Sequence, residues 1–211
     1  ANLPAGGPMT RSVAAVVIGT SAGGVEALGS LLPAFEPDCG VPVLVVVHMP
    51  RERPSLLPEL FASRCRLAVR EAEDKQPLEP DTVYFAPPDY HLLVDAGPVL
   101  ALSSDELVHY SRPAIDVLFE SAADLFGGAL LGIVLTGANA DGAAGLAAVQ
   151  RAGGLTLVQD PSSAAAAAMP EAALKAAPGS PRLTLTQLAD LLRVLRQGQL
   201  PSQASVWTSS R

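Results

Sequence analysis

The sequence predicts an α/β fold, a doubly wound and mostly parallel sheet with helices on both faces, formed by a single domain. Four short apolar runs rich in β-branched residues resemble strands that are buried on both faces. Stretches with helical spacing separate these runs, as expected when parallel strands alternate with crossover helices. The 211 residues are 49% hydrophobic and 17% charged, which is enough apolar material for a full core.

The predicted strands of the main sheet are apolar at successive positions, so both of their faces are apolar. They are Val13–Gly19, Val41–Val47, Leu131–Thr136 and Leu155–Val158, with Val83–Ala86 as a further candidate. The segment His91–Asp95 is also a candidate strand, and Pro98–Ser103 is expected to pair with it as a hairpin across Ala96–Gly97.

The predicted helices lie between or after these strands. They are Gly24–Leu32, Pro54–Ser63, Asp116–Leu125, Ala143–Arg151, Ala164–Ala177 and Thr186–Arg196. The Ala-rich fifth stretch is expected to be broken at Met169-Pro170. The last has a regular amphipathic pattern of leucines, which predicts one face packed on the sheet.

The two ends of the chain differ in character from the apolar middle. We expect residues 1–11 to be a flexible N-terminal segment, residues 12–196 to be the folded domain and residues 197–211 to be a flexible tail. The opening "ANLPAGGPMT" lacks the basic cluster and apolar stretch of a signal peptide, and no run is long enough to cross a bilayer. These features predict a cytoplasmic protein.

Charge and cysteine content exclude several classes of function. A net charge of −7, with no dense run of Lys or Arg, disfavours a nucleic-acid-binding surface. The two cysteines, Cys39 and Cys65, have no metal-ligand spacing and form no disulfide framework, so each is expected to be a small buried apolar residue. No metal and no cofactor is expected.

The segment "VVIGTSAGGVEAL" joins the first main strand to its helix and contains G-x-S-x-G from Gly19 to Gly23. This pattern is typical of a nucleophile elbow, in which a serine lies on a crowded strand-to-helix turn. Ser21 would be the nucleophile, and the start of the following helix would favour a developing oxyanion. The alternative structural role for Ser21 is a helix N-cap.

A second alternative is a dinucleotide loop, because Gly19-x-Ser21-x-x-Gly24 resembles G-x-G-x-x-G. Serine is a poor substitute for the middle glycine, which lets the pyrophosphate approach the backbone. Such a site also requires Asp or Glu at the end of the second strand, about 20 residues on. That strand ends instead in His48, which suits a general base.

Ligands bind outside the carboxyl ends of the strands in such sheets, so polar residues at these ends are candidates for function. His48 follows the second strand, and Asp141 lies in "TGANADG" after the strand "LGIVLTG". Asp141 would orient the imidazole and stabilise the imidazolium, completing a Ser-His-Asp triad. The structural alternatives are a hydrogen-bonded histidine at a strand end and a helix N-cap at Asp141.

Six segments, in order, resemble the catalytic domain of the CheB-type chemotaxis receptor methylesterases. They are "IGTSAGGVEAL", "VVVHMP", "YFAPPDYHLLV", "SRPAIDVLFESAA", "LTGANADGAAGL" and "VQDPSSAAAAAMPEAA", and they span nearly the whole chain. The resemblance implies a protein-glutamate methylesterase that hydrolyses γ-glutamyl methyl esters on the cytoplasmic helices of chemoreceptors, and many members also deamidate glutamines. Catalytically inactive receptor-docking and nucleotide-binding modules on the same fold remain the alternatives.

By the family's pattern, Ser21 is the nucleophile, His48 the general base and acid, and Asp141 the residue that orients His48. The resemblance implies an oxyanion hole formed by the backbone N–H groups of Ala22 and Ala138. The implied partners are methylated receptor helices and a receiver domain or response regulator, with no nucleic acid and no membrane insertion.

The chain departs from the family's pattern at three places. Val47 stands where glutamine is common, and Ala138-Asn139 stand where Met-Gly is common. A receiver domain commonly precedes the catalytic domain, so we expect either an excised domain or a stand-alone member.

Three further residues have open or structural roles. Arg112 is either part of the substrate rim or a surface residue at a helix entry. His91 and His109 are expected to be structural.

Overall fold

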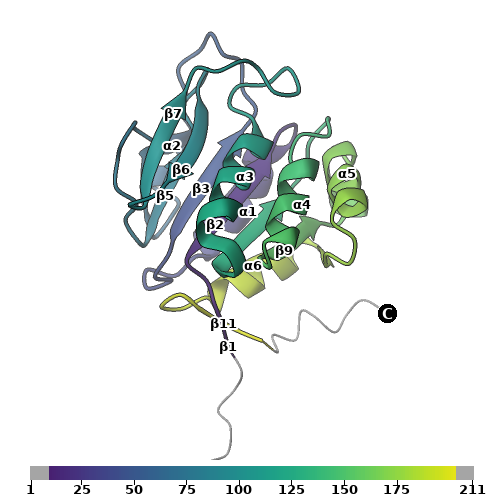
Figure 1. Ribbon diagram of the computed structural model, residues 1–211. Coiled ribbons are helices and arrows are strands. Elements are labelled where there is room, and N and C mark those ends of the chain that lie inside the picture. Colours follow the sequence, from purple (N-terminus) through teal and green to yellow (C-terminus); the bar gives the residue numbers. More distant parts are fainter. Residues whose placement is uncertain (1–9, 203–211) are drawn as a thin grey trace, which may run out of the picture.

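The computed structural model describes residues 10–202 and contains one seven-stranded parallel sheet with the strand order β10-β9-β8-β2-β3-β5-β4 (Figure 1). All neighbouring strands in this sheet pair in parallel. The strands are β2 (Ala15–Thr20), β3 (Pro42–Val47), β4 (Ala68–Glu71), β5 (Thr82–Phe85), β8 (Leu130–Val134), β9 (Leu155–Gln159) and β10 (Arg182–Leu183). The predicted fold class is therefore confirmed.

Helices cover both faces of the sheet, and each face has its own apolar core. Helices α3, α4 and α5 lie over one face, together with the β6–β7 hairpin, and α1, α2 and α6 pack on the other (Figure 1). The helices are α1 (Gly24–Leu31), α2 (Leu57–Ala62), α3 (Ile115–Phe126), α4 (Ala143–Arg151), α5 (Ala168–Ala176) and α6 (Leu185–Arg193). Side chains of β2 alternate between the two cores, which explains why the central strands are apolar at every position.

Two smaller antiparallel pairs complete the fold. The hairpin of β6 (His91–Asp95) and β7 (Val99–Ser103) has the predicted pairing, with Asp95 opposite Val99 across the turn. Strand β1 (Thr10–Ser12) pairs with β11 (Gln199–Pro201), which joins the two ends of the described chain.

The β1–β11 pair corrects the expected domain boundaries. Residues 10–11 and 197–202 were expected in flexible ends, but Thr10 pairs with Pro201 and the Gln197 N–H donates to Asp38. Short polar strands of this kind carry no clear periodicity, so the sequence did not predict them. The rest of the two expected flexible segments, 1–9 and 203–211, lies outside the described residues.

Two other differences from the sequence prediction have local causes. Strand β4 is a sheet edge with exposed, charged residues such as Arg70 and Glu71, so it lacks the apolar pattern of its neighbours. Met169-Pro170 does not break a helix but lies in the first turn of α5, where the N–H that proline lacks would have no partner within the helix.

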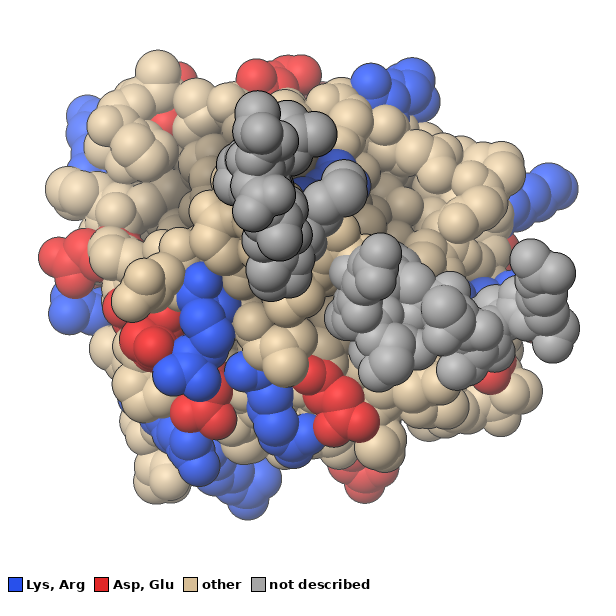
Figure 2. Space-filling view, turned by 90° about the horizontal axis from the view of Figure 1, so that it is seen from below, with Lys and Arg blue, Asp and Glu red and all other residues tan. Residues whose placement is uncertain are grey.

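The lower face of the molecule carries basic and acidic side chains side by side (Figure 2). Ion pairs such as Arg66–Glu36 at 2.6 Å and Arg193–Asp190 at 2.7 Å join exposed or half-buried groups of opposite charge. Figure 2 shows no broad basic surface among the described residues of this face, in keeping with the acidic composition.

Candidate active site

Ser21, His48 and Asp141 follow three adjacent strands, β2, β3 and β8, at their carboxyl ends. Thr20 pairs with Val47 in the β2–β3 register, so Ser21 and His48 are the next residues on neighbouring strands. The chain passes from β2 to β3 on one side and returns to β8 on the other side of β2. The three residues therefore surround the point where the strand order reverses, the usual position of a ligand site in such sheets.

His48 and Asp141 form a short, mostly buried contact. His48 Nε2 lies 2.6 Å from Asp141 Oδ2, and the side chains are 11% and 0% exposed. The carboxylate also accepts the backbone N–H groups of Ile115 at 2.7 Å and Asp116 at 2.9 Å. Asp141 is thus fixed by the first turn of α3, and its remaining contact holds one nitrogen of the imidazole.

Asp141 is not an N-cap of its own helix. Gly142 occupies the N-cap position of α4 without a side-chain bond. Two N–H groups in the first turn of α4 are instead satisfied by the buried Asp116, which accepts from Gly142 at 2.9 Å and Gly145 at 2.7 Å. The N-cap interpretation of Asp141 is therefore wrong, although its carboxylate does bind the N-terminus of the neighbouring helix.

Ser21 lies half-buried on the turn between β2 and α1, and its N–H donates to the Thr136 carbonyl at 3.0 Å. The N-cap of α1 is Gly23, with φ 79°, so the N-cap interpretation of Ser21 is wrong. The left-handed residue of the turn is likewise Gly23 and not Ser21. Within residues 10–202, no hydrogen bond joins Ser21 Oγ to His48, a bond that often tightens only when substrate is bound.

The surroundings of Gly19 explain why a residue without a side chain stands two positions before Ser21. A Cβ at this position would lie 2.3 Å from Ile115 Cγ2, closer than any real contact. Ile115 begins α3, and its N–H donates to Asp141. Gly19 therefore lets the first turn of α3 approach β2 closely enough to hold the carboxylate.

Thr136 joins the two loops that contain Ala22 and Ala138. Its carbonyl accepts from the Thr20 hydroxyl at 2.7 Å, and its own hydroxyl lies 2.9 Å from the Ala22 carbonyl and accepts the Ala166 N–H at 2.9 Å. The N–H groups of Ala22 and Ala138 have no acceptor among the described residues, so both can serve a ligand.

Arg112 is held at the same rim as His48. Its guanidinium donates to Asp89 Oδ1 at 2.7 Å and 3.1 Å and to the carbonyls of Ser104 and Asp105 at 3.0 Å each. A hollow of about 140 Å³ is lined by His48, Arg112 and Tyr110, among others. Arg112 is only 18% exposed, which favours the rim over a free surface position.

The other two histidines have hydrogen-bonding positions. His91 is buried, lies 2.8 Å from the Glu106 carbonyl through Nε2, and accepts the Ala114 N–H through Nδ1, so it fixes the entry to α3. His109 contacts Asp116 at 3.0 Å and is half-exposed. His109, Asp116 and Asp141 lie near one another, but three of the four carboxylate oxygens already accept backbone N–H groups, which disfavours a metal at this cluster.

Sequence reasoning assigned no role to Asp116, Thr136 or Asn139. The signal available for Asp116 was an acid at the start of a predicted helix, and for Thr136 a polar residue at the end of an apolar strand. Both signals are common in strands and helices without function. Only the contacts across the sheet edge distinguish these residues.

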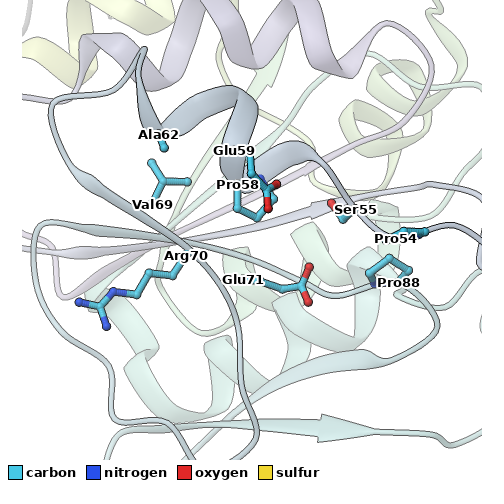
Figure 3. Close-up of a pocket in the computed structure, with 9 residues that line it drawn as sticks. All are labelled: Pro54, Ser55, Pro58, Glu59, Ala62, Val69, Arg70, Glu71 and Pro88. Carbon is cyan, nitrogen blue, oxygen red and sulfur yellow. The ribbon is translucent and has the colours of Figure 1, made fainter.

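A separate hollow of about 520 Å³ lies between α2 and the edge strand β4 (Figure 3). Glu59 and Glu71 both line it, and burial, together with the nearby Glu59 charge, raises the pKa of Glu71. None of the three candidate catalytic residues lines this hollow. We therefore place the candidate active site at the strand ends.

The model of the CheB methylesterase family matches residues 16–192, which include all of β2 to α5 except the first residue of β2. The chain belongs to this family. Its two ends, beyond the matched range, include the β1–β11 pair.

Several curated proteins are similar to this member of the family. A protein of Leptospira interrogans (strain Fiocruz L1-130), provisionally named a protein-glutamate methylesterase/protein-glutamine glutaminase, is 40% identical over 88% of this chain and 96% of its own length. The protein-glutamate methylesterase/protein-glutamine glutaminase of Trichodesmium erythraeum is 37% identical over 86% of this chain. That alignment spans 53% of the Trichodesmium protein, about half its length.

The catalytic domain of the CheB methylesterase of Thermotoga maritima has the same fold. The superposition has a TM-score of 0.82 at 30% identity and covers 86% of this chain and 98% of the Thermotoga domain. In the described part of this family member, no helix is both long and apolar enough to pass through a membrane.

Proposed function

We propose that this protein is a protein-glutamate methylesterase acting on γ-glutamyl methyl esters of chemoreceptors, with Ser21 as nucleophile, His48 as general base and acid, and Asp141 orienting His48. The observation that supports this most strongly is the 2.6 Å contact between His48 Nε2 and the buried Asp141 carboxylate, beside Ser21 on the adjacent strand. Family membership supports the same chemistry.

Acyl-enzyme chemistry follows from this arrangement. Because an ionised carboxylate only accepts, Asp141 places the proton of neutral His48 on Nε2 and leaves Nδ1 as the base. Nδ1 takes the proton of Ser21 Oγ as the oxygen attacks the ester carbonyl, and His48 then returns it to the departing methoxide, which leaves as methanol.

Water completes the cycle by the same route. His48 removes a proton from the water that attacks the acyl-serine, the ester bond between the γ-glutamyl acyl carbon and Ser21 Oγ breaks, and the serine regains its proton as the glutamate carboxylate is released. The free N–H groups of Ala22 and Ala138 are proposed to bind the oxyanion in both steps. The same steps on a glutamine amide would release ammonia, and the names of the relatives include this activity.

The partners proposed are the methylated cytoplasmic helices of chemoreceptors, with Arg112 at the rim that meets them. A receiver domain or response regulator is the proposed source of control. A nucleotide-binding module on this fold is disfavoured, because the strand end that would need an acid carries His48.

The test is methanol release from methylated receptor membranes, with the purified chain and its Ser21→Ala variant. We expect the wild type to release methanol and the variant to release none, while both unfold at the same urea concentration. A folded wild type without turnover would indicate an inactive docking domain instead. Full turnover in Ser21→Ala would refute the assignment of the nucleophile.

A further inference from the structure

Asn139 lies against the imidazole nitrogen that the proposed mechanism needs. Its Nδ2 is 3.4 Å from His48 Nδ1, while Asp141 holds the other ring nitrogen at 2.6 Å. Both contacts come from the loop between β8 and α4. The ring is thus held at its two nitrogens by residues two positions apart.

The orientation of the Asn139 amide is fixed by a second bond. Its Oδ1 accepts the Asp141 N–H at 3.0 Å, so the NH₂ group must face away from that donor and toward His48. Asp141 requires the proton on Nε2, so Nδ1 carries the lone pair and can only accept. The amide therefore donates into the lone pair that the Ser21 proton would use.

We propose that Asn139 is a positioning residue that occupies His48 Nδ1 in the resting enzyme and is displaced when Ser21 transfers its proton. This inference rests on the proposed esterase function. The bond at 3.4 Å is long, so it orients the ring and is released at small cost. An N–H donor stabilises the neutral imidazole and opposes the imidazolium, so Asn139 restrains the base as well as orienting it.

The amide side chain of Asn139 is the group that occupies His48 Nδ1. A residue without a side chain leaves Nδ1 open to Ser21. The presence of a donor here predicts a less reactive resting state that substrate binding must overcome.

The charged and titratable groups near His48 lie at other positions around the ring than the neutral Asn139 amide. Asp141 faces Nε2, and Arg51, Arg112 and Tyr110 line the hollow beside the ring. Behind Asp141 lie Asp116 and His109. A substitution at Asn139 leaves all these groups in place, so its effect on His48 can be measured separately.

The matched variants are Asn139→Ser and Asn139→Asp. Serine can still accept from the Asp141 N–H but is too short to reach His48. Aspartate keeps the shape and the acceptor but replaces the donor with a carboxylate oxygen beside Nδ1. Because both keep the bond within the loop, both are expected to unfold near the wild-type urea midpoint.

The first measurement is kcat/KM for methanol release as a function of pH. We expect the acidic limb to lie at higher pH in Asn139→Ser than in the wild type, because the N–H donor at Nδ1 is gone. The shift should be larger in Asn139→Asp. Plateau kcat should rise by about two- to fivefold in Asn139→Ser with KM unchanged, since Asn139 acts through His48.

The second measurement does not depend on turnover. In a Ser21→Ala background, ¹⁵N NMR of the ring nitrogens is simple because the chain has only three histidines. We expect the Nδ1 resonance of His48 to move toward that of a free unprotonated nitrogen when Asn139→Ser is added. If the protein proves to have no esterase activity, this spectrum alone decides the role of Asn139.

Unchanged Nδ1 resonances and unchanged acidic limbs in both variants would overturn the proposal and leave Asn139 as a loop-stabilising residue. A loss of kcat in both folded variants without a pH shift would overturn it as well. An upward shift in the order wild type, Asn139→Ser, Asn139→Asp would support it.

Discussion

Asp116 lies in the first turn of α3 and binds the start of α4, whereas Asp141 precedes α4 and binds the start of α3. Asp141 precedes α4 and accepts two N–H groups from the first turn of α3, while Asp116 lies in that turn and accepts the N–H groups of Gly142 and Gly145 at the start of α4. Two helix N-termini and two carboxylates thus form one buried unit. The position of the catalytic candidate Asp141 depends on all four.

This exchange makes Asp141→Asn a test of both structure and catalysis. An amide places one NH₂ group where a carboxylate oxygen accepts N–H donors, so the free energy of unfolding should fall by about 1–3 kcal/mol. Turnover should fall by up to about 10⁴-fold, because Nε2 of His48 loses the acceptor that sets its tautomer. Urea unfolding and methanol release measure the two effects. Turnover close to wild type would mean that Asp141 only stabilises the first turn of α3 and does not act through His48.

The pKa of Asp116 is raised by its burial and by the nearby Asp141 charge. The folded protein therefore binds this proton more tightly than the unfolded chain does. It follows that the contribution of Asp116 to stability is greatest at low pH and falls as pH rises through its folded pKa.

Asp116→Asn removes this titration and keeps an oxygen for the Gly142 and Gly145 N–H groups. We expect the stability of the variant, relative to the wild type, to increase as pH rises from about 3.5 to about 7. Urea unfolding at several pH values measures the difference. A difference that is constant with pH would contradict the raised pKa.

Gly19→Ala should disturb the site indirectly, by displacing the first turn of α3. The new methyl group meets Ile115 at 2.3 Å, so the first turn of α3 must move and carry its N–H away from Asp141. We expect a loss of about 1–3 kcal/mol in stability and a fall in kcat. Gly29→Ala is the matched control, because nothing lies within 4 Å of its Cβ on helix α1. There we expect a gain of about 0.5–1 kcal/mol and unchanged kcat.

Thr136→Val tests whether the two loops of the proposed oxyanion hole depend on one hydroxyl. Valine has the same shape but leaves the Ala166 N–H without its acceptor and the Ala22 carbonyl without a donor. Stability should fall by about 1–3 kcal/mol, and kcat should fall more than KM changes. Thr136→Ser keeps the hydroxyl and should retain most of the activity. Equal losses in both variants would indicate that the methyl group matters more than the hydrogen bonds.

The strands with buried faces were predicted closely because burial on both sides leaves a continuous apolar run. Strand β3, expected at Val41–Val47, is found at Pro42–Val47, and α4 has the predicted bounds. The edge strand β4 and the terminal pair β1–β11 were missed, because their residues are exposed and have no hydrophobic period. Their pairing depends on neighbours that are distant in the chain.

The apolar runs alone indicate that Ser21 and His48 directly follow central strands and that Asp141 lies in the loop after another one, because each run is buried on both faces and stops at the sheet edge. The contacts of these three residues depend on the tertiary structure. Capping, for example, is local in most helices, but Asp141 binds a helix that begins 26 residues earlier in the chain. Likewise, the contact between Asn139 and His48 spans 91 residues and follows from the parallel pairing of β2 with β3 and β8. Spacing in the sequence fixes the face of the sheet on which a side chain lies. The residues that it contacts depend on which strands are neighbours in the sheet.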